Sequence, residues 1–164
     1  MKRRIDADEL ARDAKLLSEL EAIYREVEER HRDHGCPAST ECCRFGVTGR
    51  EPYVTSVEVA LVARAIAKRG GRLPSKRPAS LAIVKDERVC PLLGADGRCT
   101  VYAARPLGCR TFYCERATQP SPVSQTELNE WVRAIKDVAA RHAPRGDAGR
   151  PLTRALADEK LGLR

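Results

Sequence analysis

Seven cysteines are the residues of this sequence whose type and spacing could do chemistry. They form two groups, three in the stretch 36–43 and four in the stretch 90–114. The full set is Cys36, Cys42, Cys43, Cys90, Cys99, Cys109 and Cys114. Thiolates bind zinc in closed tetrahedral sites, and four thiolates can also hold an iron–sulfur cluster. We therefore predict that the two groups are halves of a metal or iron–sulfur site that holds the fold together.

The sequence leaves the identity of the metal open. No two cysteines form a CxxC pair of the zinc-finger kind, and no Cx3Cx2C triplet is present. Free cysteine is also among the most buried residue types, so thiols that only fill the core are the alternative. We favour a metal because all seven lie in two segments rich in Pro and Gly, and none lies in a predicted helix.

The N-terminus bears on the compartment and hence on the state of the thiols. Residues 1–10 begin with basic side chains but continue into acidic ones, with no apolar stretch of the signal-peptide kind. No later window approaches the 18 or so apolar residues of a membrane helix. We expect a cytoplasmic protein that does not enter a membrane. Thiols stay reduced there, so clustered cysteines indicate metal or redox chemistry rather than disulfides.

Three amphipathic helices are predicted to position the cysteine segments. Apolar residues recur at steps of three and four from about residue 5 to residue 30. A capping box at Thr55 and Glu58 starts a second helix, which Gly70 and Gly71 end. A second capping box, at 124–127, starts a third helix that runs to about residue 142 and carries Trp131 as a core anchor.

The remaining stretches predict short strands and turns. We expect strands at 81–84, 88–93 and 98–102, with a turn at 95–97 that places Cys90 and Cys99 on the two arms of a hairpin. Next to it, Pro106 disfavours helix at the preceding residue, and Gly108 is free to take a positive φ. The fold we expect is α+β: a mainly helical small domain with a short β-hairpin and long Cys-bearing loops.

The length and composition predict a single domain with a thin core. The chain has 164 residues, of which only 4% are aromatic and 32% are charged, so a bound metal would add useful stability. We place one cysteine-cluster domain at 1–142. The stretch 143–164 is predicted to be a linker rich in Pro, Gly and Arg followed by a short C-terminal helix.

The order of the cysteines and their neighbours resembles a known family. Cys36…Cys42-Cys43 is followed by Thr55-x-x-Glu58 and then by Cys90-Pro-Leu…Cys99-x-Val-Tyr102-x-x-Arg105-Pro106-x-x-Cys109-Arg110-x-Phe112-x-Cys114. Over about 36–114 this pattern resembles the YkgJ-type cysteine-cluster family, the zinc- or iron-chelating CxxCxxCC domain. The resemblance implies a metal-chelating domain whose biochemical role is largely undefined. A similar cluster occurs in flagellin lysine N-methylases, which suggests an iron–sulfur centre.

One departure from the family pattern concerns the number of ligands. The second cysteine of the family's first motif falls on Ser39 in this chain. Eight thiols make two sets of four, but seven do not. Either another group completes one site, or there is a single site and some cysteines lie outside it. His31 and His34 could supply an imidazole, although we favour a non-ligand role for them.

Two arginines flank the last thiols. We predict that Arg105 and Arg110 donate hydrogen bonds or positive charge that offsets an anionic thiolate cluster. The alternative is a surface ion pair.

A basic segment suggests an acidic partner. The net charge is +7, and seven cations lie between Arg64 and Lys85 with no acid among them before residue 86. The set is Arg64, Lys68, Arg69, Arg72, Lys76, Arg77 and Lys85. Nucleic acid or an acidic protein could bind there. A solvated face is the interpretation we favour, because no aromatic side chains are interleaved for stacking on bases.

The leading function is thus metal binding, with zinc or an iron–sulfur cluster held by clustered thiolates. One alternative is a redox or methyl-transfer enzyme that uses an iron–sulfur centre. Another is a nucleic-acid-binding module that a metal stabilises. No catalytic triad, phosphate-binding glycine loop or paired-carboxylate motif is present, so enzymatic activity stays open.

Overall fold

The computed structural model describes residues 7–33, 40–71, 88–111, 123–159 and 161. Within them the chain is mainly helical with one two-stranded antiparallel sheet, so the α+β expectation is confirmed at that level. The elements are α1 (Ala7–Arg30), η1 (Glu41–Cys43), α2 (Phe45–Thr48), β1 (Tyr53–Val54), α3 (Ser56–Lys68), η2 (Tyr102–Ala104), α4 (Leu107–Thr111), α6 (Gln125–His142), β2 (Arg150–Pro151) and α7 (Leu152–Asp158).

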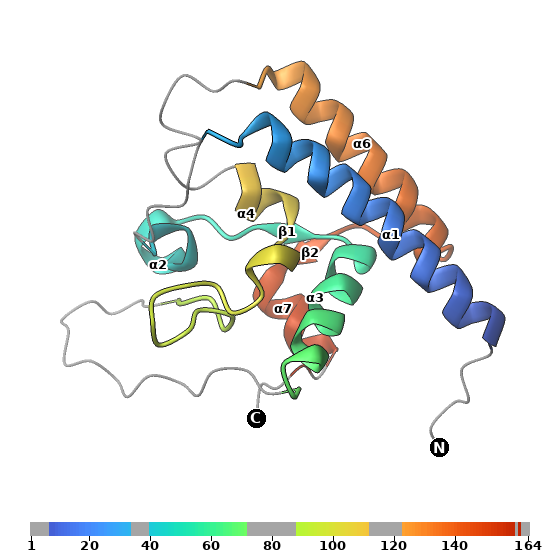
Figure 1. Ribbon diagram of the computed structural model, residues 1–164. Coiled ribbons are helices and arrows are strands. Elements are labelled where there is room, and N and C mark those ends of the chain that lie inside the picture. Colours follow the sequence, from blue (N-terminus) through green and yellow to red (C-terminus); the bar gives the residue numbers. More distant parts are fainter. Residues whose placement is uncertain (1–6, 34–39, 72–87, 112–122, 160, 162–164) are drawn as a thin grey trace.

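The three long helices α1, α3 and α6 form the scaffold, as the apolar periodicity predicted. In Figure 1, α1 and α6 lie side by side and α3 packs below them. Leu20 and Val27 of α1 are fully buried between them. Leu10 is exposed, in contrast, because the first turns of α1 extend beyond the other helices.

Both predicted capping boxes are present. The carboxylate of Glu58 accepts from the backbone N–H of Thr55 at 2.9 Å, and Glu127 does the same for Ser124 at 2.9 Å. Gly70, with φ of 91°, and Gly71, with φ of 71°, follow α3, which confirms the predicted helix end.

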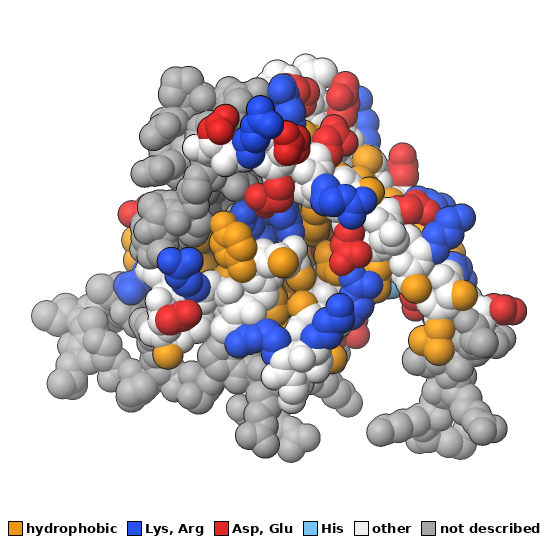
Figure 2. Space-filling model, viewed as in Figure 1, with side chains coloured by type: hydrophobic (Ala, Val, Ile, Leu, Met, Phe, Trp, Pro, Cys, Tyr) orange, Lys and Arg blue, Asp and Glu red, His pale blue; other side chains and the backbone are white. Residues whose placement is uncertain are grey.

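Opposite charges alternate on the outer surface of α1 and α6. Figure 2 shows acidic and basic side chains intermingled over these helices. Two ion pairs bridge them, Arg30 with Glu127 at 2.5 Å and Arg141 with Glu19 at 2.5 Å. Such exposed pairs add little stability, so the helix pair depends mainly on its apolar contacts.

The predicted hairpin is wrong in detail. Instead of two strands, the stretch 88–102 forms a turn with a single bridge between Leu93 and Cys99. The predicted first arm, 88–93, contacts two different segments. The N–H of Cys90 donates to the carbonyl of Cys43 at 2.7 Å, and the residues after Pro91 form backbone hydrogen bonds with 98–100. The expected strand at 81–84 lies outside the described residues.

The only sheet in the described part of the chain joins segments that the sequence did not pair. Tyr53 lies opposite Pro151, and Val54 lies opposite Arg150. This pairing places β2 and α7 against the same core as the long helices, where Leu152 and Leu156 are buried. Part of the predicted linker is anchored as well, because the Asp147 carboxylate accepts from the N–H of Ser56 at 2.6 Å.

Gly108 serves a different purpose from the one predicted. It lies inside α4 and is absent from the residues with positive φ. A Cβ atom built on it would come within 3.0 Å of the Pro52 Cβ. The glycine therefore allows α4 to approach the chain before β1 closely.

We expected that the protein does not enter a membrane, and the described helices bear on this. Among the described helices, none is both long and apolar enough to cross a bilayer.

Replacement of Leu156 by alanine tests whether α7 is part of the core. Leu156 is fully buried, so its truncation should lower the free energy of unfolding by about 2–5 kcal/mol. Arg154→Ala on the exposed face of α7 should change it by less than about 0.5 kcal/mol. Urea denaturation measures both. Equal, small effects would show that α7 is only an appended helix.

Candidate metal site

Five of the seven cysteines line one cavity of about 990 Å³. They come from three segments that are distant in the chain: η1, the turn 88–100 and α4. The five are Cys42, Cys43, Cys90, Cys99 and Cys109. Cys36 and Cys114 lie outside the described residues. The structure thus brings together members of both sequence groups, as predicted.

Backbone hydrogen bonds hold these segments around the cavity. The bond from Cys90 to Cys43 joins the turn to η1, and Thr100 closes the turn through a 2.8 Å bond from its N–H to the carbonyl of Leu92. Gly97 takes φ of 77° at the tip, as the expected turn chemistry requires. Short segments, and not the long helices, therefore form the thiol-bearing wall.

The thiols of Cys42 and Cys43 lie near each other, with their Sγ atoms 3.8 Å apart. Two sulfurs that each lie about 2.3 Å from a tetrahedral metal are separated by about 3.8 Å. The backbone bond from the N–H of Cys90 to the carbonyl of Cys43, at 2.7 Å, brings Cys90 next to this pair. The donor set and this spacing fit a thiolate-bound metal or cluster.

The described thiols do not converge on a point. In the part of the chain that the structure describes, no group of three Cys, His, Asp or Glu side chains is placed to hold a metal ion. Cys90, Cys99 and Cys109 lie on the same cavity wall and are the described candidates for further ligands.

The surroundings of the thiols favour their protonated form. Burial raises the pKa of Cys109 well above its ordinary value, and the neighbouring Cys99, Cys42 and Cys43 raise it further. Burial also raises the pKa of Cys99. The hydrogen bond with Cys42 lowers the pKa of Cys43, but the neighbouring Cys90 thiol, burial and the Cys99 thiol outweigh it, so that the pKa rises to about 12. A hydrogen bond to Cys43 and then burial raise the pKa of Cys42.

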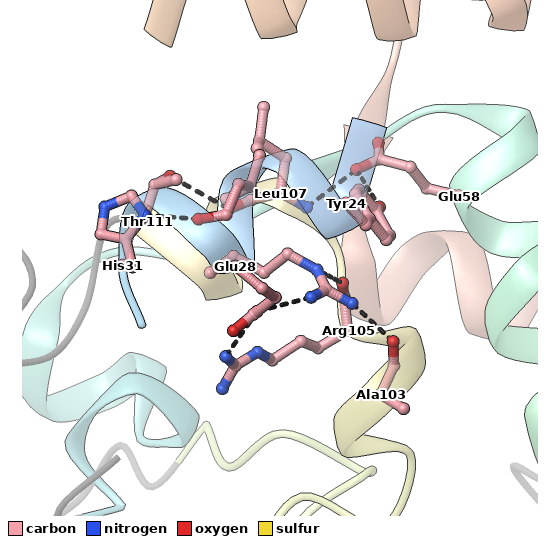
Figure 3. Close-up of polar contacts among 10 residues, drawn as sticks. Tyr24, Glu28, His31, Glu58, Ala103, Arg105, Leu107 and Thr111 are labelled. Carbon is pink, nitrogen blue, oxygen red and sulfur yellow. Dashed lines mark hydrogen bonds and ion pairs between the residues drawn. The ribbon is translucent and has the colours of Figure 1, made fainter. Parts of the chain in front are cut away.

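Arg105 and Arg110 form ion pairs with one carboxylate, and both arginine side chains are buried although that of Glu28 is 37% exposed. The Nη2 of Arg105 lies 3.0 Å from the Glu28 carboxylate, and Nη1 of Arg110 lies 2.6 Å from it. Figure 3 shows Glu28, from α1, facing the segment that carries Arg105. Their side chains are only 9% and 3% exposed. Ion pairs are therefore present, as one alternative from the sequence proposed, but the two arginines are buried and not at the surface.

The two arginines differ in their relation to the thiols. Arg105 lines the cavity, and its charge lowers the pKa of Cys42, Cys99 and Cys109, opposing the effect of burial. Arg110 does not line it. Its guanidinium instead donates to the carbonyls of Arg105 and Ala103, at 2.8 and 2.5 Å. Arg105 fits the predicted electrostatic role, and Arg110 positions the backbone.

Glu58 is a further anchor that the sequence revealed only in part. Besides its capping bonds, its buried carboxylate accepts from the Tyr24 hydroxyl at 2.9 Å and from the N–H of Leu107 at 3.0 Å. It thereby joins α1, α3 and the start of α4 (Figure 3). The capping-box spacing identified this residue, but nothing in the sequence indicated its two distant partners.

The candidate histidine ligand lies elsewhere. His31 is buried and its Nδ1 lies 2.8 Å from the carbonyl of Val27. Its ring centroid is 6.3 Å from that of Trp131, and it does not line the cavity. Trp131 is buried and donates from Nε1 to Glu26 at 3.0 Å, which confirms it as a core anchor. His34 and Ser39 are outside the described residues.

The three described cations of the basic segment have different surroundings. Arg64 forms an ion pair with Glu21 of α1. Arg69, which ends α3, lines the thiol cavity, whereas Lys68 is exposed and does not. The other four cations of the segment lie outside the described residues.

A scan against models of protein families and searches of curated proteins and of solved structures found no match to this chain. The fold and the site therefore define only a class: a mainly helical domain with a short antiparallel sheet and a thiol-lined cavity on one side.

Removal of the Glu58 carboxylate tests its role as an anchor. Glu58→Ala leaves the Tyr24 hydroxyl and the Leu107 amide buried without an acceptor, so we expect a loss of about 3 kcal/mol or more in the free energy of unfolding. The matched control is Glu127→Ala, which removes the exposed capping box of α6 and should have a clearly smaller effect. Similar losses in the two variants would contradict the anchoring role.

The thiol pKa values predict how stability depends on pH. Because burial raises the pKa of Cys109 and Cys99 in the folded state, the unfolded thiols ionise first. The reduced, metal-free protein should therefore keep full stability below the ordinary thiol pKa and lose it as pH rises from about 8 to 9.5. Urea denaturation across this range measures the slope, which should be shallower in Cys109→Ala. A rise in stability over the range would contradict the prediction.

Proposed function

We propose that this protein binds metal, coordinating zinc or an iron–sulfur cluster through clustered cysteine thiolates. The observation that carries the proposal is the meeting of five cysteines from three separate segments on the wall of one cavity. Proximity of this kind among residues so distant in the chain is typical of thiolate metal sites.

The burial of the thiols supports this function over simple core filling. Of the five described cysteines, only Cys90 is buried, and the other four are half-buried at the cavity. Cysteines that serve as small hydrophobes are usually enclosed on all sides. Half-buried thiols on a cavity wall can reach a ligand.

The ligands would come from the five cysteines of the cavity, with Cys36 and Cys114 as further candidates from the sequence. Zinc in a closed site of four thiolates stabilises a fold, whereas an iron–sulfur cluster supplies electron transfer. Arg105 would offset the negative charge of the thiolates from the cavity wall. A site that depends on reduced thiols suits the cytoplasm, which we propose as the compartment.

We also propose that the chain belongs with the YkgJ-type cysteine-cluster proteins. Support comes from the run Arg105-Pro106-x-x-Cys109-Arg110, because each named residue has a structural role. Pro106 precedes α4, Cys109 lines the cavity, and the two arginines share Glu28. The nucleic-acid alternative is less favoured, since Arg64 is engaged by Glu21.

Elemental analysis and a visible spectrum of protein purified without oxygen test the proposal. Iron with sulfide and a broad band near about 400 nm would indicate a cluster, and stoichiometric zinc without colour would indicate a structural site. Chelation of the metal should also lower the free energy of unfolding. Neither metal, together with freely titratable thiols, would contradict the proposed function.

A pair of variants in the same cavity sharpens this test. Cys43→Ser removes one thiol from the wall and should reduce metal content or weaken metal binding by at least about tenfold. Thr40→Ser, also on the wall, removes no thiol and should bind metal like the unchanged protein. Equal metal content in all three proteins would exclude Cys43 as a ligand.

A further inference from the structure

We propose that the thiol cavity also binds a small oxyanion, a carboxylate or phosphate group on a small molecule, through Arg105 and Arg69. The proposal rests on the proposed function only in that the metal and the anion share one cavity.

Arg105, which lines the cavity, has a donor that the described residues leave unused. Its side chain is nine-tenths buried, and Nη2 is engaged by Glu28 at 3.0 Å. Its Nε–H is fully buried and has no hydrogen-bond partner in the described part of the chain. A buried N–H without an acceptor is unfavourable, so a ligand that supplies one gains binding energy there. Glu28 and the Tyr102 ring, 3.8 Å from the guanidinium carbon, hold the group in place.

Arg69 supplies a second positive charge on the same wall. It lies at the C-terminal end of α3, is exposed, and forms no ion pair with any described residue. Its charge reaches the cavity, as its effect on Cys99 indicates. A cation at a helix C-terminus is favourable by itself, so the position of Arg69 at the end of α3 does not indicate a ligand. Its place on the cavity lining does.

The cavity has the size and lining of a small-molecule site. About 990 Å³ is at the upper end of the range of about 300–1,000 Å³ that such sites span, and it far exceeds the space of one metal ion. Arg69, Arg98 and Arg105 line it beside one carboxylate, that of Asp96, and beside the thiols, which add negative charge only when they bind metal. Asp96 accepts from the N–H of Arg98 at 3.1 Å, within its own turn. Leu92 and Leu152 supply an apolar part of the wall.

Two competing roles make different predictions. If the Arg105 Nε–H donates to a metal-bound thiolate, the metal-loaded protein has no free donor and binds no anion. If the cations instead face nucleic acid, Arg69 and Lys68 should contribute alike, because they are neighbours at the end of α3. Arg105 is too deeply buried for contact with the phosphates of a duplex.

The experiment titrates sulfate and, separately, benzoate into the metal-loaded protein at constant ionic strength, observed by calorimetry and by the ¹⁵N resonance of the Arg105 Nε–H. We expect saturable binding that shifts this resonance, with benzoate bound more tightly because it can contact the leucines. Arg69→Gln should weaken binding by about tenfold, while the control Lys68→Gln should stay within about twofold. Arg105→Lys, which keeps the charge and loses the Nε–H, should abolish it.

The outcomes separate this proposal from the proposed function. Elemental analysis of the same samples reports the metal, and the titration is repeated with reduced, metal-free protein. Absence of metal with saturable anion binding would overturn metal binding and support the anion site. No saturable binding in either form, or equal weakening in Arg69→Gln and Lys68→Gln, would overturn the anion site. Because Arg69 is exposed, its variant keeps the test decisive even if Arg105→Lys fails to fold.

Discussion

The thiol-bearing side of the molecule depends on one carboxylate. Glu28 projects from α1 and pairs with both Arg105 and Arg110. Without it, two nearly buried guanidinium groups would lie close together with no compensating charge, which is strongly unfavourable in a protein interior. Because these arginines flank Cys109 in the chain, the ion pair sets where that part of the cavity wall lies relative to α1. The long helix α1 thus positions a segment whose own helices, η2 and α4, are short.

The other parts of the wall are joined mainly by backbone hydrogen bonds. The turn that carries Cys90 and Cys99 is joined to η1 by the bond from Cys90 to Cys43 and by a bridge from Val89 to Arg44. With few aromatic side chains in the whole sequence, the core offers limited apolar burial to support such loops. In the function we propose, a metal would cross-link them, and its binding energy would contribute directly to folding. The stability of the fold would in this way depend on the metal bound in the cavity.

The helices could be predicted closely, and the sheet could not. The apolar repeat in 7–30 and the capping boxes at Thr55 and Ser124 are local signals, so the sequence locates those helices within a few residues. The pairing of β1 with β2 joins residues about a hundred positions apart, each in a strand of two residues. Such short strands carry no alternating pattern. The close approach of Gly108 to Pro52 could not be predicted for a related reason, because Pro52 is distant from it in the sequence.

By itself, the sequence determined the residue types of the site: seven thiols in two segments and two arginines beside the last of them. It also determined the scaffold helices, since their caps and periodicity act within a few residues. Only the tertiary structure decided that five thiols share one cavity, that Arg105 faces it while Arg110 does not, and that His31 packs against Trp131 instead. The physical reason is that burial and charge pairing depend on contacts between distant segments, which no local pattern records.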